Sequence, residues 1–273
     1  MPLPAPSGPS TAAIVTSVRS LMTPLQFPPA EPTHADQRYA ERTGRGVPPL
    51  ADVYLPDGDG PHPSVVLIHG GGWVLGHRRM KPMRYLATKL VEQGYAVFVP
   101  EYRLVFRGGR LTEARQDAVE ALRWWVAQGE RFGLDPAHLS LVGLSAGATL
   151  MLLAADAVRD EIPLFRAVPI FGVYDFDSMH GGLGRLIRPL VLQEHHPADV
   201  SPRNLAPLPC PVVLMHGTGD RLVPHSQAEA LRDAWAEGNV RLVSYEGLPH
   251  AFFNDATSEG CKQATADLLA ALA

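Results

Sequence analysis

The chain has 273 residues, of which 46% are hydrophobic and 19% charged, a composition typical of a globular protein with one large or two small domains. Its 24 basic and 28 acidic side chains give a formal net charge of -4, so it has no basic excess for binding a nucleic-acid backbone. The longest unbroken apolar runs have six residues, against the ~18 needed to cross a bilayer, and we expect no membrane span.

The first part of the chain is rich in proline, and we expect it to form an arm. Residues 1–10 contain four prolines and no basic side chain, and Arg19 interrupts the short apolar stretch that follows. This is not the pattern of a secretion signal, so a cytoplasmic location is the default expectation. We expect residues 1–50 to lie as an arm on the main body, with a short helix at about 12–22. Residues 51–273 are then the main domain.

From residue 65 onward, short apolar strands alternate with amphipathic helices. The predicted strands cover residues 65–68, 95–99, 139–142, 167–173, 212–215 and 240–245. The predicted helices cover residues 83–93, 112–132, 146–158, 226–237 and 258–272, the fourth opened by a capping box of Ser226 and Glu229. Strands that are apolar on both faces belong in a parallel sheet covered by helices on both sides, so the pattern predicts a doubly wound α/β domain. Ligands bind such sheets at the carboxyl ends of the strands.

A serine stands at the predicted turn between a strand and a helix. Residues 143–147 read Gly-Leu-Ser-Ala-Gly and follow the strand at 139–142 directly. In so tight a turn, side chains at the two flanking positions would collide with neighbouring backbone, so glycine fits both. The turn would expose the Ser145 hydroxyl at the sheet edge and bring the Ala146 N–H toward the same point. An ordinary glycine-rich turn is the alternative, but the strand before it and the helix after it favour a nucleophile.

Three glycines follow the strand at 65–68, within residues 69–73, which read His-Gly-Gly-Gly-Trp. Glycines let the backbone approach a ligand closely with its N–H groups free. Such donors can stabilise the oxyanion of an acyl-transfer intermediate. A flexible loop or a phosphate-binding loop is the alternative, but the Lys-Ser/Thr ending of a phosphate-binding loop is missing.

A nucleophilic serine needs a base, and the base needs an acid to orient it. His250 follows the last predicted strand, which places it on the same sheet edge as Ser145. Asp220 follows the preceding strand and is the candidate acid. The chain order of serine, acid and histidine is the order that a hydrolase sheet imposes.

Three other residues compete for these roles. His216 is the rival base, but it stands at a strand end, where a histidine usually braces a loop. Asp175 is a rival acid that follows an earlier strand, too far across the sheet. Glu246 is nearer, but we expect its side chain to serve the turn before the histidine loop.

Together, these motifs resemble those of the α/β-hydrolases and, within that superfamily, the esterases similar to hormone-sensitive lipase. Residues 101–104, Glu-Tyr-Arg-Leu, resemble the stretch that follows the third core strand there, and the resemblance covers about residues 53–273. It implies an α/β-hydrolase fold with a small cap, and an acyl-enzyme mechanism. It also implies oxyanion donors at the backbone N–H groups of Gly71, Gly72 and Ala146.

The chain departs from this family pattern in several places. Leu144 precedes the serine where the family usually has Asp, and Gly147 is followed by Ala148 instead of a second glycine. The Ala-Pro-Glu that usually follows Tyr-Arg-Leu is also missing. Trp73 and residues 172–175, Gly-Val-Tyr-Asp, also resemble bacterial arylformamidases and feruloyl-type esterases, which leaves the substrate class open.

Family members cover the site with the N-terminal arm and with an insertion after the sixth core strand. Here the insertion is short, at about residues 175–204, and one apolar helical face within it is formed by Leu183, Leu186, Ile187 and Leu190. This face either packs on the core or roofs the site. A roof of this size predicts a small pocket for acyl groups of two to six carbons, lined by Trp73, Leu144, Leu183 and Ile187.

We therefore expect a serine hydrolase that cleaves carboxylic esters with short acyl groups. An arylformamidase, or another amide or formamide hydrolase, is the alternative on the same triad. A non-catalytic ligand-binding homologue would need a broken triad, whereas serine, acid and base are all present. The expected partner is a small-molecule ester, with no nucleic acid and no cofactor, and the expected state is a monomer or homodimer.

Two remaining pairs of residues could suggest other chemistry. His195 and His196 are adjacent, so their side chains point apart, and we expect no metal site there. Cys210 and Cys261 are too few for a disulfide scaffold or a four-cysteine zinc site, and we expect them to be separate thiols.

Overall fold

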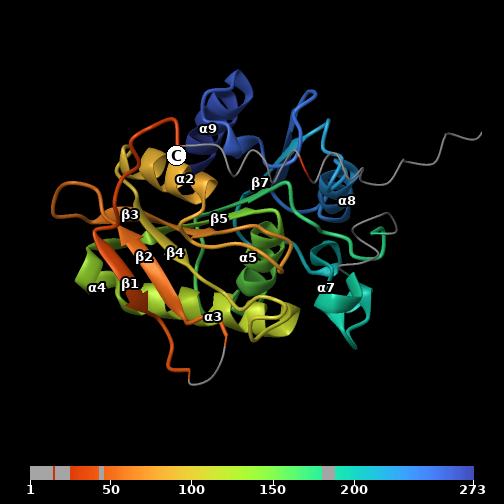
Figure 1. The fold of residues 1–273 in the computed structure, drawn as a ribbon, viewed down its shortest axis with the longest axis horizontal. Coiled ribbons are helices and arrows are strands. Elements are labelled where there is room, and N and C mark those ends of the chain that lie inside the picture. Colours follow the sequence, from red (N-terminus) through yellow and green to blue (C-terminus); the bar gives the residue numbers. More distant parts are fainter. Residues whose placement is uncertain (1–14, 16–24, 43–45, 180–187) are drawn as a thin grey trace, which may run out of the picture.

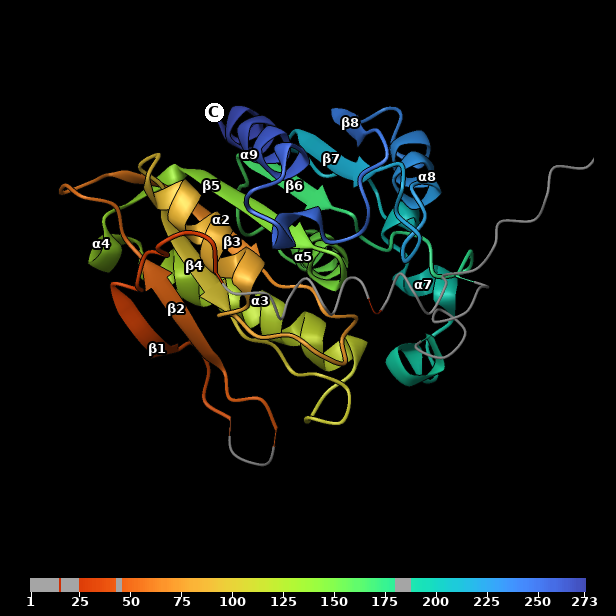
Figure 2. The same cartoon turned by 45° about the horizontal axis from the view of Figure 1, so that its top comes forward.

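The computed structural model describes residues 15, 25–42, 46–179 and 188–273. Within these ranges the chain forms a mixed sheet with helices on both faces (Figure 1, Figure 2). Apart from residue 15, the helix expected at 12–22 lies outside the described residues.

The described strands lie in the order β1-β2-β4-β3-β5-β6-β7-β8. Strands β3 to β8 run parallel to one another, whereas β2 is antiparallel to both β4 and β1. The doubly wound α/β class is therefore confirmed. Their bounds are β1 His34–Arg38, β2 Leu50–Tyr54, β3 His62–Ile68, β4 Ala96–Pro100, β5 Leu134–Leu144, β6 Arg166–Ile170, β7 Val212–Gly217 and β8 Val240–Tyr245.

The strand order places the two glycine motifs side by side. β4 lies on one side of β3 and β5 on the other, so the order reverses at β3. Residues 69–73 follow β3 and residues 143–147 span the end of β5, so both motifs lie at this switch point. Ligands bind doubly wound sheets at such points.

Strands β1 and β2 were not predicted from the sequence, which indicated only an arm in this region. β1 is polar and partly exposed at the sheet edge, and β2 carries Asp52 at its centre. Asp52 is fully buried, and Arg79 donates two hydrogen bonds to it, at 2.6 and 2.8 Å. A charged residue that is paired only in the folded state breaks the apolar pattern by which a strand is recognised.

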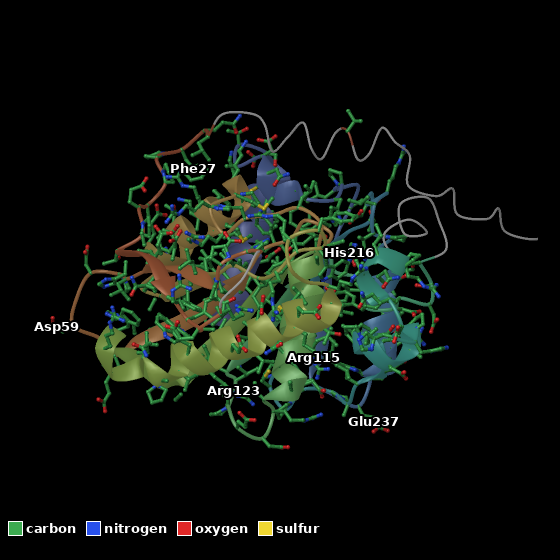
Figure 3. All side chains as sticks on the ribbon, turned by 60° about the horizontal axis from the view of Figure 1, so that its bottom comes forward. Phe27, Asp59, Arg115, Arg123, His216 and Glu237 are labelled. Atoms are coloured by element: carbon green, nitrogen blue, oxygen red, sulfur yellow. The ribbon has the colours of Figure 1, made fainter. Side chains whose placement is uncertain are left out.

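The helices cover the two faces of the sheet. One face carries α2 (Lys81–Val91) and α9 (Glu259–Leu272), and the other carries α3 (Leu111–Ala127), α5 (Ala146–Ala157) and α8 (Ser226–Ala234). Arg123 lies on the outer surface of α3 (Figure 3) and pairs with Glu161 at 2.7 Å. The shorter helices of the described residues include α4 (Gly129–Phe132), α7 (Pro197–Val200) and two single 3₁₀ turns, Pro202–Asn204 and Phe252–Asn254.

Two details of the predicted helices are wrong. The helix predicted at 112–132 is interrupted at Gln128, which separates α3 from α4. The capping box of Ser226 and Glu229 does not form, because Ser226 is already the first helical residue. The helical turn begins before Ser226, because the Gln227 N–H donates to the carbonyl of Pro224.

Alternate side chains of the central strand β3 point to opposite layers of the core. Val65 and Leu67 pack under α2 and α9, whereas Val66 and Ile68 pack under α3 and α5. All four are buried, which explains why residues 65–68 of this strand are uniformly apolar in sequence.

Candidate active site

Ser145 occupies the turn from β5 into α5 in a conformation that residues with side chains rarely adopt. Its φ of 53° and ψ of -118° lie far from the helical values that begin at Ala146. A Cβ atom at position 143 would collide with the carbonyl oxygen of Gly147, and one at position 147 with that of Ile68. The two glycines therefore let the strand, the helix and β3 approach closely enough to form this turn.

The structure brings Ser145, His250 and Asp220 into one hydrogen-bonded chain. His250 Nδ1 donates to Asp220 Oδ2 at 2.6 Å. Because a carboxylate only accepts, this bond places the proton of the neutral imidazole on Nδ1. The free lone pair of Nε2 then faces Ser145 Oγ, which lies 3.1 Å away. Each atom is thus placed for the serine proton to pass to the imidazole.

Asp220 is held rigidly and kept ionised. Its Oδ1 accepts the backbone N–H groups of Leu222 and Val223, each at 2.9 Å, and its side chain is fully buried. Burial raises the pKa of this carboxyl, but the adjacent His250 and His216 imidazoles outweigh that effect, so the pKa lies well below its usual range. The aspartate therefore carries a negative charge opposite His250 across the pH range of ordinary assays.

The three rival residues have other contacts. His216 is fully buried at the end of β7 (Figure 3), where its Nε2 donates to the Val223 carbonyl at 3.0 Å and lies 3.3 Å from Asp220 Oδ2. Asp175 accepts from Arg203 at 2.7 Å. Glu246 is exposed on the turn after β8. His216 thus braces the aspartate loop, as the sequence indicated.

The glycine loop after β3 approaches the serine from the other side. A Cβ atom at Gly70 would lie 2.8 Å from the Leu144 carbonyl oxygen and 3.1 Å from Ser145 Cβ. The carbonyl of Gly70 accepts from His69 Nδ1, and the carbonyl of Gly71 accepts from the backbone N–H groups of the turn that follows. In a trans peptide the next N–H points opposite to the carbonyl, so the N–H groups of Gly71 and Gly72 are turned away from the donors that bind these carbonyls.

The known proteins that this chain resembles are named as ester hydrolases or esterases. A family model described as BD-FAE matches residues 51–166. The chain is 32% identical over 219 residues to the probable carboxylic ester hydrolase LipM of Mycobacterium tuberculosis, covering 71% of this chain and 50% of that protein. It is 28% identical over 253 residues to the probable isoprenylcysteine alpha-carbonyl methylesterase ICME of Oryza sativa subsp. japonica, covering 81% and 60%. The chain thus spans about half the length of the curated relatives it matches.

Among solved structures, the chain resembles Thermogutta terrifontis esterase 2 phosphoramylated by tabun. The TM-score is 0.73 at 25% identity, and the match covers 90% of this chain and 96% of the other. The chain has the α/β-hydrolase fold. Its mostly parallel sheet is the one that the sequence resemblance implied.

One residue near the histidine was missed by the sequence analysis. Phe171 follows β6 directly, and its ring packs edge-on against His250 with centroids 4.8 Å apart. Its φ of 39° marks it as a further strained position at the sheet edge. Its place after a strand could have identified Phe171, because Ser145, Asp220 and His250 also follow strands of this sheet.

The predicted pocket residues are only partly described. Trp73 is buried and packs against Phe176 with ring centroids 5.6 Å apart. Leu144 is buried in the core layer under α2 and α9. Of the predicted insertion face, Leu190 is partly buried against the opposite layer, and the remaining members lie outside the described residues: Leu183, Leu186 and Ile187.

Other candidate sites among the described residues lack the required geometry. His195 contacts Thr112 at 2.6 Å, and within the described ranges no cluster of three His, Cys, Asp or Glu side chains could hold a metal ion. Cys210 and Cys261 are buried free thiols, and burial raises the pKa of Cys210 to about 11. None of the helices in the described segments is long and apolar enough to cross a bilayer.

Proposed function

We propose that this hydrolase cleaves carboxylic esters of short acyl chains through an acyl-enzyme intermediate. Ser145 is the nucleophile and His250 is the general base. Asp220 orients the base and stabilises the positive charge that it gains. The observation that carries the proposal is the unbroken chain of contacts, 3.1 Å from serine to histidine and 2.6 Å from histidine to aspartate.

The reaction runs in two halves. Ser145 Oγ bonds to the acyl carbon while its proton moves to His250 Nε2, and the carbonyl oxygen becomes an oxyanion. The N–H groups of Gly71, Gly72 and Ala146 stabilise that oxyanion. The carbon–oxygen bond to the alcohol then breaks, and His250 returns the proton to the departing alkoxide. Water attacks the acyl-enzyme by the same route and releases the carboxylic acid and the free serine.

The relatives support ester hydrolysis in particular. LipM and ICME are named as an ester hydrolase and a methylesterase, and the Thermogutta enzyme is an esterase phosphoramylated by tabun. An organophosphorus reagent of this kind is the natural probe for a nucleophilic serine.

The preference for short acyl groups rests on the size of the cap. Of the predicted arm at residues 1–50, β1 belongs to the sheet. We therefore assign the cap to the arm before β1 and to the insertion at about 175–204, and the catalytic domain to residues 51–273 together with β1. An insertion this short lacks the length to build a groove for a fatty acyl chain. The pocket is expected to be lined by Trp73, Leu144, Leu183 and Ile187, and overfilling such a pocket costs about 1–3 kcal/mol.

A fluorophosphonate label and a substrate panel test the proposal. Wild-type protein should be labelled at Ser145, and Ser145→Ala should not. Kinetics with p-nitrophenyl acetate, butyrate and laurate should be compared with those for N-formylkynurenine. Faster turnover of N-formylkynurenine than of every ester would establish the arylformamidase alternative. Absence of both labelling and turnover would refute the enzymatic function.

A further inference from the structure

A buried carboxylate joins the two ends of the loop that carries the glycines. The loop runs from His69, at the end of β3, to Arg78, just before α2. Glu101, directly after β4, lies against both ends. Its side chain is 4% exposed, so this is an interior anion rather than a surface one.

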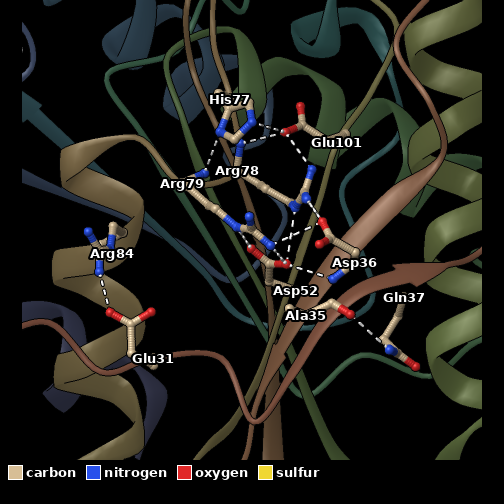
Figure 4. Close-up of polar contacts among 10 residues, drawn as sticks. All are labelled: Glu31, Ala35, Asp36, Gln37, Asp52, His77, Arg78, Arg79, Arg84 and Glu101. Atoms are coloured by element: carbon tan, nitrogen blue, oxygen red, sulfur yellow. Dashed lines mark hydrogen bonds and ion pairs between the residues drawn. The ribbon is translucent and has the colours of Figure 1, made fainter.

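At the far end of the loop, Glu101 binds Arg78 twice. Oε1 accepts from the Arg78 backbone N–H at 3.0 Å and from its guanidinium at 3.1 Å. The ring of His77 adds a third contact, with Nε2 at 3.4 Å from the same oxygen. His77 Nδ1 accepts from the Arg79 N–H, so its proton is on Nε2 and faces the carboxylate (Figure 4).

At the near end, Glu101 faces the ring of His69. Oε2 lies 3.5 Å from His69 Nε2, and the ring is fully buried, stacked on Tyr102 with centroids 4.2 Å apart. The other nitrogen, Nδ1, donates to the carbonyl of Gly70 at 2.8 Å. Tyr102 also donates to the His69 carbonyl at 2.9 Å, which fixes the start of the loop.

These contacts form a chain that ends on one peptide plane. Glu101 orients the His69 ring, the ring holds the carbonyl of Gly70, and that carbonyl belongs to the same rigid peptide as the N–H of Gly71. A rotation of the ring would therefore turn the N–H of Gly71. Because the carboxylate and the carbonyl are both acceptors, the His69 ring can donate to both only as an imidazolium, whereas His250 faces one carboxylate and one hydroxyl.

The charge on Glu101 is maintained by its partners. Burial raises the pKa of this carboxyl, but the neighbouring His69 ring and the Arg78 N–H outweigh that effect and lower the pKa to about 2. Beyond Arg78, a second layer of ion pairs anchors the network to the sheet edge. Arg78 and Arg79 both bind Asp36 on β1 and Asp52 on β2 (Figure 4).

We propose that Glu101 is a positioning residue for the oxyanion donors, because its carboxylate holds the His69 ring that orients the Gly70–Gly71 peptide. This role rests on the proposed ester hydrolysis at Ser145. Loss of an oxyanion donor costs about 10²–10³ in kcat, and a misoriented donor costs less. We therefore expect Glu101→Gln to lower kcat by about tenfold or more while KM changes by less than about twofold.

The side chain of Glu101→Gln keeps its size but has only one oxygen. Its NH2 group must face either the Arg78 N–H or the His69 ring, so one end of the loop loses its acceptor. The kcat for p-nitrophenyl butyrate should be measured per active site titrated with a fluorophosphonate, so that misfolded protein does not count. A trifluoromethyl ketone, whose serine adduct carries an oxyanion, should bind more weakly by the same factor as kcat falls.

Asp52→Asn is the matched control. It removes a buried carboxylate from the same network, but Asp52 contacts Arg78, Arg79 and Asp36 rather than His69. Its kcat per titrated site should stay within about twofold of wild type. An equal fall in both variants would assign the effect to the network as a whole and overturn the proposal.

His69→Asn tests the same link from the other side, including the case in which Glu101→Gln yields no folded protein. It should lower kcat at least as far, and the double variant should be no slower than His69→Asn alone, because both changes break one chain. If the losses of kcat in the two single variants multiplied in the double variant, Glu101 and His69 would act independently and the proposed link between them would be refuted. Full turnover in Glu101→Gln refutes this assignment alone, whereas a wild-type protein that neither titrates nor turns over refutes the ester hydrolase and the assignment together.

Discussion

Replacing Asp220 with asparagine exchanges one carboxylate oxygen for an NH2 group, and the structure determines which one. Oδ1 accepts two backbone N–H groups, those of Leu222 and Val223, so the amide oxygen takes this place. The NH2 group then stands where Oδ2 lies, 2.6 Å from His250 Nδ1. Because NH2 only donates, it selects the imidazole tautomer that carries its proton on Nε2, facing Ser145.

A histidine with its proton on Nε2 cannot accept the proton of Ser145, and the variant also lacks the charge that stabilises the imidazolium. We expect kcat to fall by about 10⁴-fold, which is about 5 kcal/mol of transition-state stabilisation. KM should change by less than about threefold. Steady-state hydrolysis of p-nitrophenyl butyrate at pH 7 and the rate of fluorophosphonate labelling measure the loss.

Asp175→Asn is the matched control, because the carboxylate of Asp175 pairs with Arg203 instead of His250. Its kcat should stay within about threefold of wild type, and thermal unfolding should show that both variants are folded. If Asp220→Asn kept more than about a tenth of wild-type kcat, or if Asp175→Asn fell as far, the tautomer argument would be wrong.

Four further predictions follow from the same structure. Ser145→Ala should lower turnover by about 10⁴-fold or more with an unchanged circular dichroism spectrum, and normal turnover would remove the serine from the mechanism. Gly71→Ala should lower kcat more than it raises KM, because the added Cβ collides with the Leu75 carbonyl oxygen and turns the N–H donors; an effect on KM alone would make the glycine a pocket residue. The kcat/KM for butyrate esters should exceed that for laurate esters by about tenfold, measured below their micelle concentrations, and equal use of laurate would indicate a long groove. Because the pKa of Glu101 is lowered to about 2 from 4.5, its ionised form stabilises the fold above about pH 4.5 and this contribution disappears as the pH falls to about 2; urea unfolding should therefore show the gap between wild type and Glu101→Gln closing across that range, and a constant gap would contradict it.

Local sequence was sufficient for the strands and helices that pack on both sides. Neighbouring side chains at residues 65–68 of β3 enter opposite core layers, so this stretch must be apolar at every position, and this is visible without a structure. The turn at Ser145 could also be predicted from the sequence. A Cβ atom at position 143 or 147 would collide with neighbouring backbone, so any sequence that forms this turn needs glycine at both positions. The parallel arrangement then places the residues that follow each strand at one edge, which brings Ser145, Asp220 and His250 within reach of one another.

Residues whose partners are distant in sequence were decided only by the tertiary structure. β1 and β2 escaped prediction because Asp52 is a buried charge whose partners, Arg78 and Arg79, lie more than twenty residues away. Glu101 was recognised as part of a family stretch, but its contact with His69 exists only because β3 and β4 are neighbours in the sheet. Periodicity records which face of an element is buried, whereas the pairing of buried charges depends on which elements the sheet places side by side.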